Sequence, residues 1–272
     1  MSKAWANVIT APVPSRSSKP RETGLTMVID KHMGMHRMRD LIQTAGDYID
    51  VVKLTFGTSA FYNEDFLIQK NSLLTSSGID VMPGGTFCEV AVWQCRLEVY
   101  LNRARQLGFS AIEVSDGTIN MDLQTRGEAI KKALEAGFKV YTEVGKKDPR
   151  EALPWDDIHR LIKFDTASGA FKVIIEAREA GKGVGIFDQD GKIKQEELDS
   201  ILAGLDDPER VMWEAPMKNQ QQALIIRAGT NVNLGNIPPD EILALEALRQ
   251  GLRGDTLKQA YLADQDWSRQ AG

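Results

Sequence analysis

The chain has 272 residues, of which 42% are hydrophobic and 26% are charged, an ordinary balance for a water-soluble globular protein. Its formal net charge of −5 argues against nucleic acid or an anionic membrane surface as the main partner. No apolar run approaches the ~20 residues of a membrane-spanning helix, and the N-terminus lacks the apolar core of a signal peptide. Cys88 and Cys95 are too few for a disulfide framework, which predicts reduced thiols in a cytoplasmic protein.

Short β-rich runs alternate with amphipathic helical segments along the chain, which is typical of repeated βα units. Residues 1–20 are rich in proline and serine and are predicted to form a flexible arm, followed by one domain over residues 21–272. Eight strands in series favour closure into a (β/α)8 TIM barrel, of the α/β class, over an open doubly wound sheet. The expected strands are Leu25–Asp30, Tyr48–Leu54, Ile79–Pro83, Ala111–Ser115, Lys139–Val144, Lys172–Ala177, Arg210–Glu214 and Asn231–Leu234.

Three of these strands close on a carboxylate: Glu143, Glu176 and Glu214. Active sites of barrel enzymes lie at the carboxyl ends of the strands, and converging carboxylates are the hard oxygen ligands that Mg²⁺ prefers. The alternative is a set of structural ion pairs, Glu176 with Arg178 and Glu143 with Lys146 or Lys147. The position at the active-site end favours the metal site.

Other polar residues are expected at the same end of the barrel. Lys53 closes the second strand and can hold an anion or act as an acid or base, although a strand-end lysine also often reaches solvent. Alternation places Glu113 and Ser115 on the inner face of the fourth strand. Asn231 and Asn233 are predicted to alternate inward on the last strand, near loops that often bind phosphate.

The segments TMVIDK, DVVKLTFGTS, PGGTFCEV, IEVSDGT, TEVGKK, IIEAREAG, MWEAP and NVNLGNI follow one another in this order. Together they resemble the phosphosulfolactate synthase family, over about Arg21 to Ile237. The resemblance implies a barrel enzyme, a lyase, that uses Mg²⁺ to add sulfite to phosphoenolpyruvate and forms (2R)-phospho-3-sulfolactate. It also implies a role in coenzyme M or sulfolactate biosynthesis, and barrels of this kind commonly form homo-oligomers.

The resemblance implies a role for each charged candidate. Lys53 is expected to be the general acid, and Glu143, Glu176 and Glu214 are the expected Mg²⁺ ligands. Arg178, Lys31 and Lys146 are expected to neutralise phosphate or sulfite, and Ser115 and Asn233 to contact substrate.

Two positions depart from the family pattern and keep alternatives open. His32 stands where the family usually has glycine, and Thr230 stands where proline is common. The first departure allows a related enolate-forming lyase with another phospho-substrate. A non-catalytic homologue, like the plant relatives associated with heat tolerance, and a Schiff-base aldolase using Lys53 are further alternatives.

Overall fold

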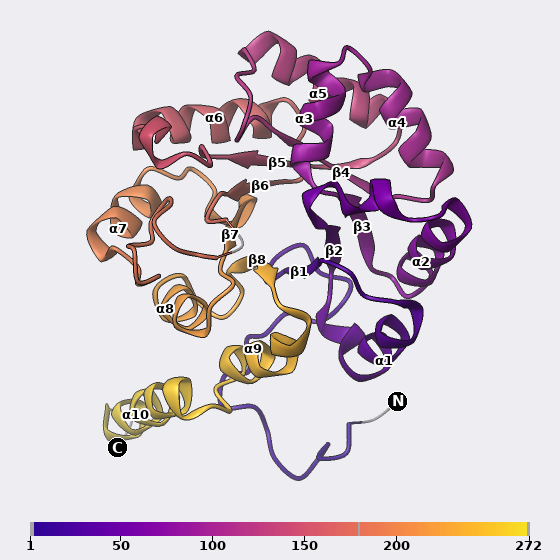
Figure 1. Ribbon diagram of the computed structural model, residues 1–272. Coiled ribbons are helices and arrows are strands. Elements are labelled where there is room, and N and C mark those ends of the chain that lie inside the picture. Colours follow the sequence, from indigo (N-terminus) through magenta and orange to yellow (C-terminus); the bar gives the residue numbers. More distant parts are fainter. Residues whose placement is uncertain (1–2, 179, 271–272) are drawn as a thin grey trace.

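The computed structural model describes residues 3–178 and 180–270, with side chains as far as Ala263. Eight parallel strands lie in the order β3-β2-β1-β8-β7-β6-β5-β4 and curl into a nearly closed barrel (Figure 1). They are β1 (Thr26–Asp30), β2 (Val51–Leu54), β3 (Asp80–Pro83), β4 (Ala111–Ser115), β5 (Lys139–Val144), β6 (Lys172–Ile175), β7 (Val211–Glu214) and β8 (Asn233–Ile237). The backbone N–H of Ser110 donates to the carbonyl of Val81 across the remaining seam between β3 and β4. The predicted TIM barrel is confirmed.

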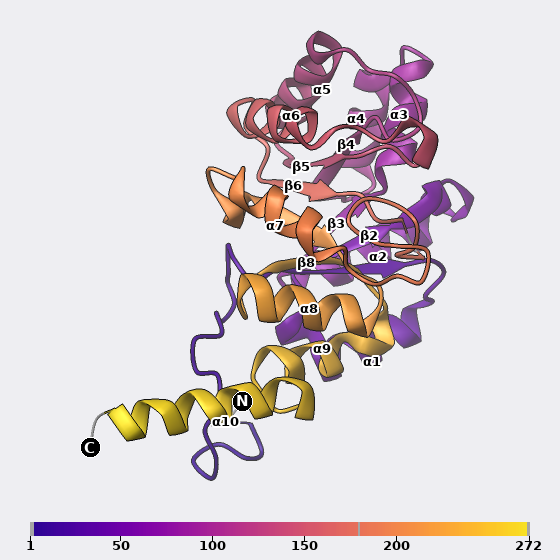
Figure 2. The same ribbon diagram turned by 90° about the vertical axis from the view of Figure 1, so that its left-hand side faces the viewer.

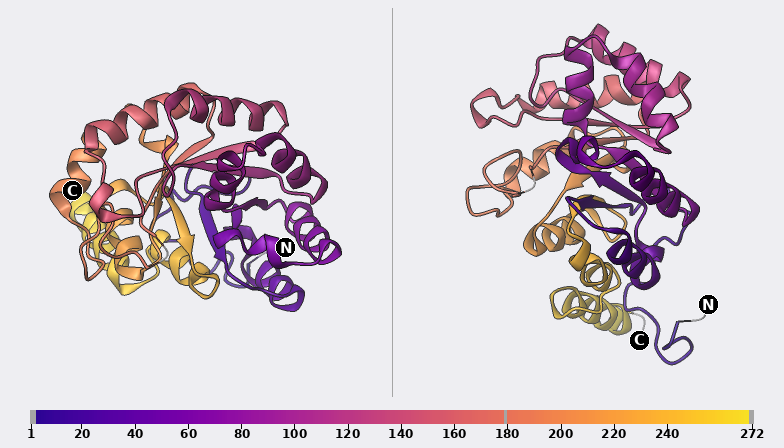
Figure 3. Two further views of the ribbon diagram at one scale, coloured as in Figure 1. Left: turned by 45° about the horizontal axis from the view of Figure 1, so that its top comes forward. Right: turned by 45° about the vertical axis from the view of Figure 1, so that its right-hand side comes forward.

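Helices cover the outside of the strands on all sides (Figure 3). They are α1 (Met35–Ala45), α2 (Glu64–Ser76), α3 (Gly85–Trp93), α4 (Leu97–Gln106), α5 (Leu123–Glu135), α6 (Trp155–Ala167), α7 (Gln195–Ala203), α8 (Lys218–Ala228), α9 (Ile242–Arg249) and α10 (Gly254–Gln270). α10 extends away from the barrel beyond α9 (Figure 2). In the described part of the chain, no helix combines the length and the apolar character needed to cross a membrane.

Two apolar layers hold the barrel together, as strand alternation requires. Outward side chains such as Val28, Val52 and Ile112 pack against the helices. The interior is filled by a smaller cluster made of Leu25, Met27, Val51, Met82, Ala111, Tyr141, Ile174 and Met212. On most strands the next inward position carries a charge, namely Lys53, Glu113, Glu143, Glu176 or Glu214, so the apolar cluster forms the floor beneath a largely polar mouth.

The strand boundaries differ from expectation where the chain turns early. β5 has the predicted bounds, but β6 ends at Ile175 rather than Ala177, because the chain bends into a turn at Arg178. Tyr48 belongs to a short 3-10 helix that precedes β2. β8 spans Asn233–Ile237, so Asn231 precedes the strand instead of lying on it.

The segment before β1 lies along α9, on the side of the barrel opposite the polar mouth (Figures 1 and 2). Arg16 forms hydrogen bonds with the carboxylate of Glu246 at 3.1–3.2 Å. The backbone N–H of Ser17 donates to Asn231 Oδ1 at 3.0 Å. These contacts bind this part of the predicted arm to its own barrel.

Candidate active site

A cavity of about 420 Å³ opens at the carboxyl ends of the strands, a size typical of small-molecule sites. Its wall is formed by strand-end side chains and by the glycine-rich start of α3. The lining residues are Ile29, Lys53, Thr55, Phe56, Gly84, Gly85, Thr86, Glu113, Glu143, Lys147, Glu176, Arg178, Glu214 and Asn236.

Lys53 is the central cation of the cavity. Its ammonium lies 2.8 Å from Glu113 Oε2, 3.2 Å from Glu143 Oε2 and 3.3 Å from Glu214 Oε1. The ammonium donates hydrogen bonds to Glu143 and Glu214 and forms an ion pair with Glu113, and each of these carboxylates comes from a different strand. Burial lowers the pKa of Lys53, but the three glutamates outweigh burial and hold that pKa well above its ordinary value. Lys53 is therefore a buried, protonated counter-charge to these carboxylates, which opposes a role as a free amine nucleophile.

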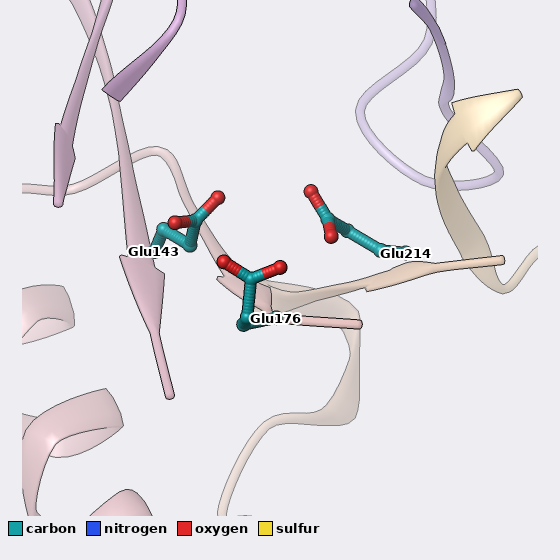
Figure 4. Close-up of side chains that lie close together, drawn as sticks. All are labelled: Glu143, Glu176 and Glu214. Atoms are coloured by element: carbon teal, nitrogen blue, oxygen red, sulfur yellow. The ribbon is translucent and has the colours of Figure 1, made fainter. Parts of the chain in front are cut away.

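Glu143 on β5, Glu176 directly after β6 and Glu214 on β7 point toward a common point (Figure 4). Each offers one carboxylate oxygen, and the three oxygens lie within 4.8 Å of one another. Glu176 Oε2 is buried and has no hydrogen-bond partner in the described part of the protein; the Lys147 ammonium is 3.7 Å away. An orphaned carboxylate oxygen beside two others fits a hard divalent cation such as Mg²⁺.

The glutamates have different surroundings, and their pKa values are shifted in different directions. Burial, together with the nearby charges of Glu143 and Glu214, raises the pKa of Glu176 well above its ordinary value. Burial acts on Glu143 in the same direction, but Lys53 and Lys147 outweigh it and keep the pKa of Glu143 low. Burial raises the pKa of Glu113 to about 7 against the opposing effect of Lys53.

Lys147, rather than Lys146, is the lysine that lines the cavity. Its ammonium donates to Thr86 Oγ1 at 3.0 Å and lies 3.4 Å from Glu143 Oε1. Lys146 is directed away and binds the loop after β4, donating to the carbonyls of Asp116 and Ile119. Arg178 lines the cavity from the turn after β6, and its backbone N–H donates to Glu176 Oε1.

Ser115 and Glu89 support the site from behind. The Ser115 hydroxyl lies 3.0 Å from both Glu143 Oε1 and Glu89 Oε1. Glu89, buried on α3, accepts the backbone N–H groups of Thr118 and Ile119 at 2.9 and 2.8 Å. Ser115 thus orients a carboxylate and does not line the cavity.

The structure does not bring Asn233 or Lys31 into the cavity wall. Asn233 lies at the amino end of β8, where its amide binds Leu25 N and the carbonyls of Glu209 and Val211. The Lys31 ammonium lies 5.8 Å from the centroid of the Phe56 ring, at the rim of the site. His32, the residue that departs from the family pattern, is exposed and does not line the cavity.

Sequence reasoning missed three residues of the site: Glu113, Lys147 and Asn236. Strand alternation predicts that Glu113 faces the barrel interior, two residues after Ala111, but it was given no role in the site. Lys147 was one of two lysines offered as a partner for Glu143. Asn236 follows Asn233 on the strand that was predicted with the wrong bounds.

Backbone strain gathers at this cavity. Phe56, Arg178 and Asn236 all line it and all have left-handed backbones, with φ of 59°, 60° and 54°. Non-glycine residues pay for this conformation, and such strain is found mainly at functional sites. The three left-handed residues at one cavity are consistent with a candidate functional site.

A second cavity of about 520 Å³ lies outside the barrel, between α2, α3 and α4. Its wall is mainly apolar, with residues such as Leu67, Phe87 and Val99. Its lining contains no group of converging carboxylates, so it is not the candidate site.

The family model and the curated relatives that this chain resembles carry the same description, phosphosulfolactate synthase. Residues 14–255 match the family model described as (2R)-phospho-3-sulfolactate synthase (ComA). The chain is 43% identical over 251 residues to a phosphosulfolactate synthase of Methanothermobacter thermautotrophicus, covering 92% of this chain and 97% of the relative. It is 47% identical over 237 residues to a phosphosulfolactate synthase of Methanocaldococcus jannaschii, covering 86% and 94%.

Among solved structures, a 3-hexulose-6-phosphate synthase matches with a TM-score of 0.52 at 15% sequence identity. The match covers 83% of this chain and 98% of that structure. At this identity, the likeness supports the barrel fold alone.

Proposed function

Because the chain belongs to the phosphosulfolactate synthase family, we propose that it adds sulfite to phosphoenolpyruvate in a Mg²⁺-dependent reaction that forms (2R)-phospho-3-sulfolactate. The observation that carries the proposal is the carboxylate group Glu143, Glu176 and Glu214, set beside Lys147 and Arg178 in one cavity. Both substrates are anions, and the cavity offers hard oxygen ligands for a metal together with two cations that face the open space.

Glu143, Glu176 and Glu214 would hold the Mg²⁺. When bound, the ion stabilises the negative charge that develops on the substrate carboxylate. Arg178, at the turn above these ligands, is placed to bind phosphate or sulfite through its planar guanidinium. Lys53 keeps Glu143 and Glu214 apart at fixed positions, so that the ligands need little rearrangement.

The bond changes assign the next task to a proton donor. The sulfur lone pair forms a bond to C3, the π electrons of the C2–C3 double bond move onto C2 and the carboxylate, and C2 then takes one proton. Lys53 is buried among carboxylates, so we assign the donation to Lys147, which lines the cavity and donates one hydrogen bond, to Thr86. Delivery from one face sets the R configuration, and solvent returns the proton to the half-buried amine.

Phosphorus NMR of phosphoenolpyruvate, sulfite and Mg²⁺ with the purified protein tests the proposal. We expect a new phosphoester resonance that requires sulfite and disappears when a chelator is added. Glu176→Gln should slow its formation by at least about 100-fold. The matched control is Glu98→Gln, on α4, whose carboxylate pairs with Lys132 at the surface.

An unchanged phosphorus spectrum with folded protein would refute the proposed reaction. A sulfite-independent loss of phosphoenolpyruvate would instead point to a lyase with another nucleophile. Trapping of Lys53 by borohydride with a keto substrate would support the aldolase alternative, which the three carboxylates around Lys53 oppose.

A further inference from the structure

The cavity has two chemically different sides. Among the described residues that line it, Ile29 and Phe56 are the large apolar side chains. Ile29 lies on β1, and Phe56 lies in the turn after β2. In the strand order, β1 is four strands from β5, and β2 is four strands from β6. The apolar wall formed by Ile29 and Phe56 therefore faces the carboxylates of Glu143 and Glu176 across the barrel.

Folding alone does not account for Phe56. Its side chain is 54% exposed, so it contributes little to the core. Its backbone is left-handed, with φ 59° and ψ 23°, a conformation that a bulky residue adopts only at a cost. A glycine or asparagine would occupy this position with less strain.

The turn around Phe56 is nevertheless firmly held. The backbone N–H of Gly84 donates to the carbonyl of Leu54 at 3.0 Å, and the Thr58 hydroxyl donates to the carbonyl of Thr55 at 2.8 Å. A Cβ atom on Gly84 would lie 3.4 Å from Thr55 Cα and 3.6 Å from Phe56 N, so the start of α3 packs directly against the turn. These contacts hold the turn that carries the ring at the cavity.

Phosphoenolpyruvate has one apolar part, the methylene carbon C3. With its carboxylate directed at the glutamate side, the methylene points toward the opposite wall. We propose that Phe56, with Ile29, receives the methylene end and makes the site selective for phosphoenols that carry no substituent on C3. This inference rests on the proposed function and specifies how that substrate is oriented.

The orientation also indicates where the nucleophile enters. Lys31 lies beside the Phe56 ring, with its ammonium 5.8 Å from the ring centroid, on the rim next to the wall. A cation at that rim attracts an anion toward C3, the carbon to which sulfite adds. Phe56 therefore determines which C3 groups fit, and Lys31 lies on the side from which sulfite approaches.

Phosphoenol-2-oxobutyrate, which carries a methyl group on C3, tests the wall. The measured quantity is kcat/KM for phosphoenolpyruvate divided by kcat/KM for the methylated compound. Phe56→Gly should lower this ratio by about tenfold, because the missing ring leaves room for the methyl group. Phe56→Leu keeps an apolar group, so its ratio should stay close to that of the unchanged protein. If the glycine variant does not fold, Phe56→Asn replaces it in the experiment.

Cys95→Gly is the matched control. Cys95 is also left-handed, with φ 54°, and it is exposed between α3 and α4, outside the cavity. Both glycine variants relieve backbone strain, so both should raise the thermal midpoint by about 2 °C. Only Phe56→Gly should change the ratio.

An unchanged ratio in Phe56→Gly would overturn the inference, whatever happens to stability. Failure of the proposed function gives a different result, since the unchanged protein would then not consume phosphoenolpyruvate with sulfite at all. In that case, calorimetric affinities of the two phosphoenols in the presence of Mg²⁺ still test the wall. Equal discrimination by the unchanged protein and Phe56→Gly would reject it.

Discussion

At the scale of single residues, the site depends on one buried ammonium. Lys53 is surrounded by Glu113, Glu143 and Glu214, and removing one partner of a buried ion pair typically costs about 3–5 kcal/mol. We therefore expect Lys53→Met to lower the thermal midpoint strongly. Mg²⁺ should restore more stability to this variant than to the unchanged protein, because the ion replaces part of the lost positive charge.

Thermal denaturation with Mg²⁺ and with a chelator measures both effects. Lys132→Met removes an exposed ammonium that pairs with Glu98 on the protein surface, and it should change stability little. If Lys53→Met and Lys132→Met gave the same midpoint, Lys53 would not be the counter-charge that organises the carboxylates.

The two cysteines are expected to differ in thiol reactivity, because one is buried and the other is exposed. Burial, with help from the charges of Glu113 and Glu89, raises the pKa of the Cys88 thiol to about 12. Cys95 is exposed. Only the thiolate reacts with alkylating agents, so at pH 8 we expect one thiol to be modified in the folded protein and two after unfolding. Rapid modification of Cys88 in the native protein would contradict its buried position on α3.

At the scale of elements, the N-terminal segment is attached to α9 by a charged pair. Burial alone would raise the pKa of Glu246, but the hydrogen bonds from Arg16 outweigh it and lower that pKa. A carboxylate with a lowered pKa stabilises the fold above its ordinary pKa, and the contribution disappears as pH falls through the lowered value. Arg16→Met should therefore cost about 2 kcal/mol at neutral pH and progressively less in acid.

Urea denaturation between pH 7 and pH 3 measures how the difference in unfolding free energy between Arg16→Met and the unchanged protein shrinks as pH falls. Lys3→Met is the comparison variant, because Lys3, in the same segment, forms a largely exposed pair with Asp47 that contributes little. A cost for Arg16→Met that does not change with pH would show that the segment is held by contacts other than this pair.

Elements with a strong local pattern could be predicted from the sequence. β5 has apolar residues bounded by a glycine and a terminal carboxylate, and its predicted bounds are confirmed. The predicted strand Asn231–Leu234 starts two residues and ends three residues before β8, because Asn231 and Asn233 alternate as if both belonged to a strand. Asn231 instead binds the N-terminal segment, a contact between residues 214 positions apart that no local pattern reveals.

The candidate site was predictable in type but only partly in membership. Strand ends indicated that Glu143, Glu176 and Glu214 converge, and their oxygens do lie together. The choice between Lys146 and Lys147 depends on the path of the loop after β5, where Gly145 has a positive φ. Alternation along a strand does not extend through such a turn, so the lysine that faces the cavity could not be identified in advance.

At the scale of the whole molecule, an acidic protein must bind two anions. The side chains that line the cavity include four carboxylates, Glu113, Glu143, Glu176 and Glu214, and three cations, Lys53, Lys147 and Arg178. With all of them ionised the cavity carries one negative charge, and one protonated glutamate makes it neutral. A bound divalent ion instead makes the fully ionised cavity positive by one charge.

This balance predicts the order of binding: the metal first, then phosphoenolpyruvate. Calorimetric titration with phosphoenolpyruvate should show no measurable binding in the presence of a chelator and clear binding with Mg²⁺. Glu113→Gln removes one negative charge without removing a proposed metal ligand, so it should permit weak metal-independent binding, whereas surface Glu98→Gln should not. Equal affinity with and without Mg²⁺ would mean that Lys147 and Arg178 alone neutralise the substrate, and that the three converging glutamates serve the fold rather than the reaction.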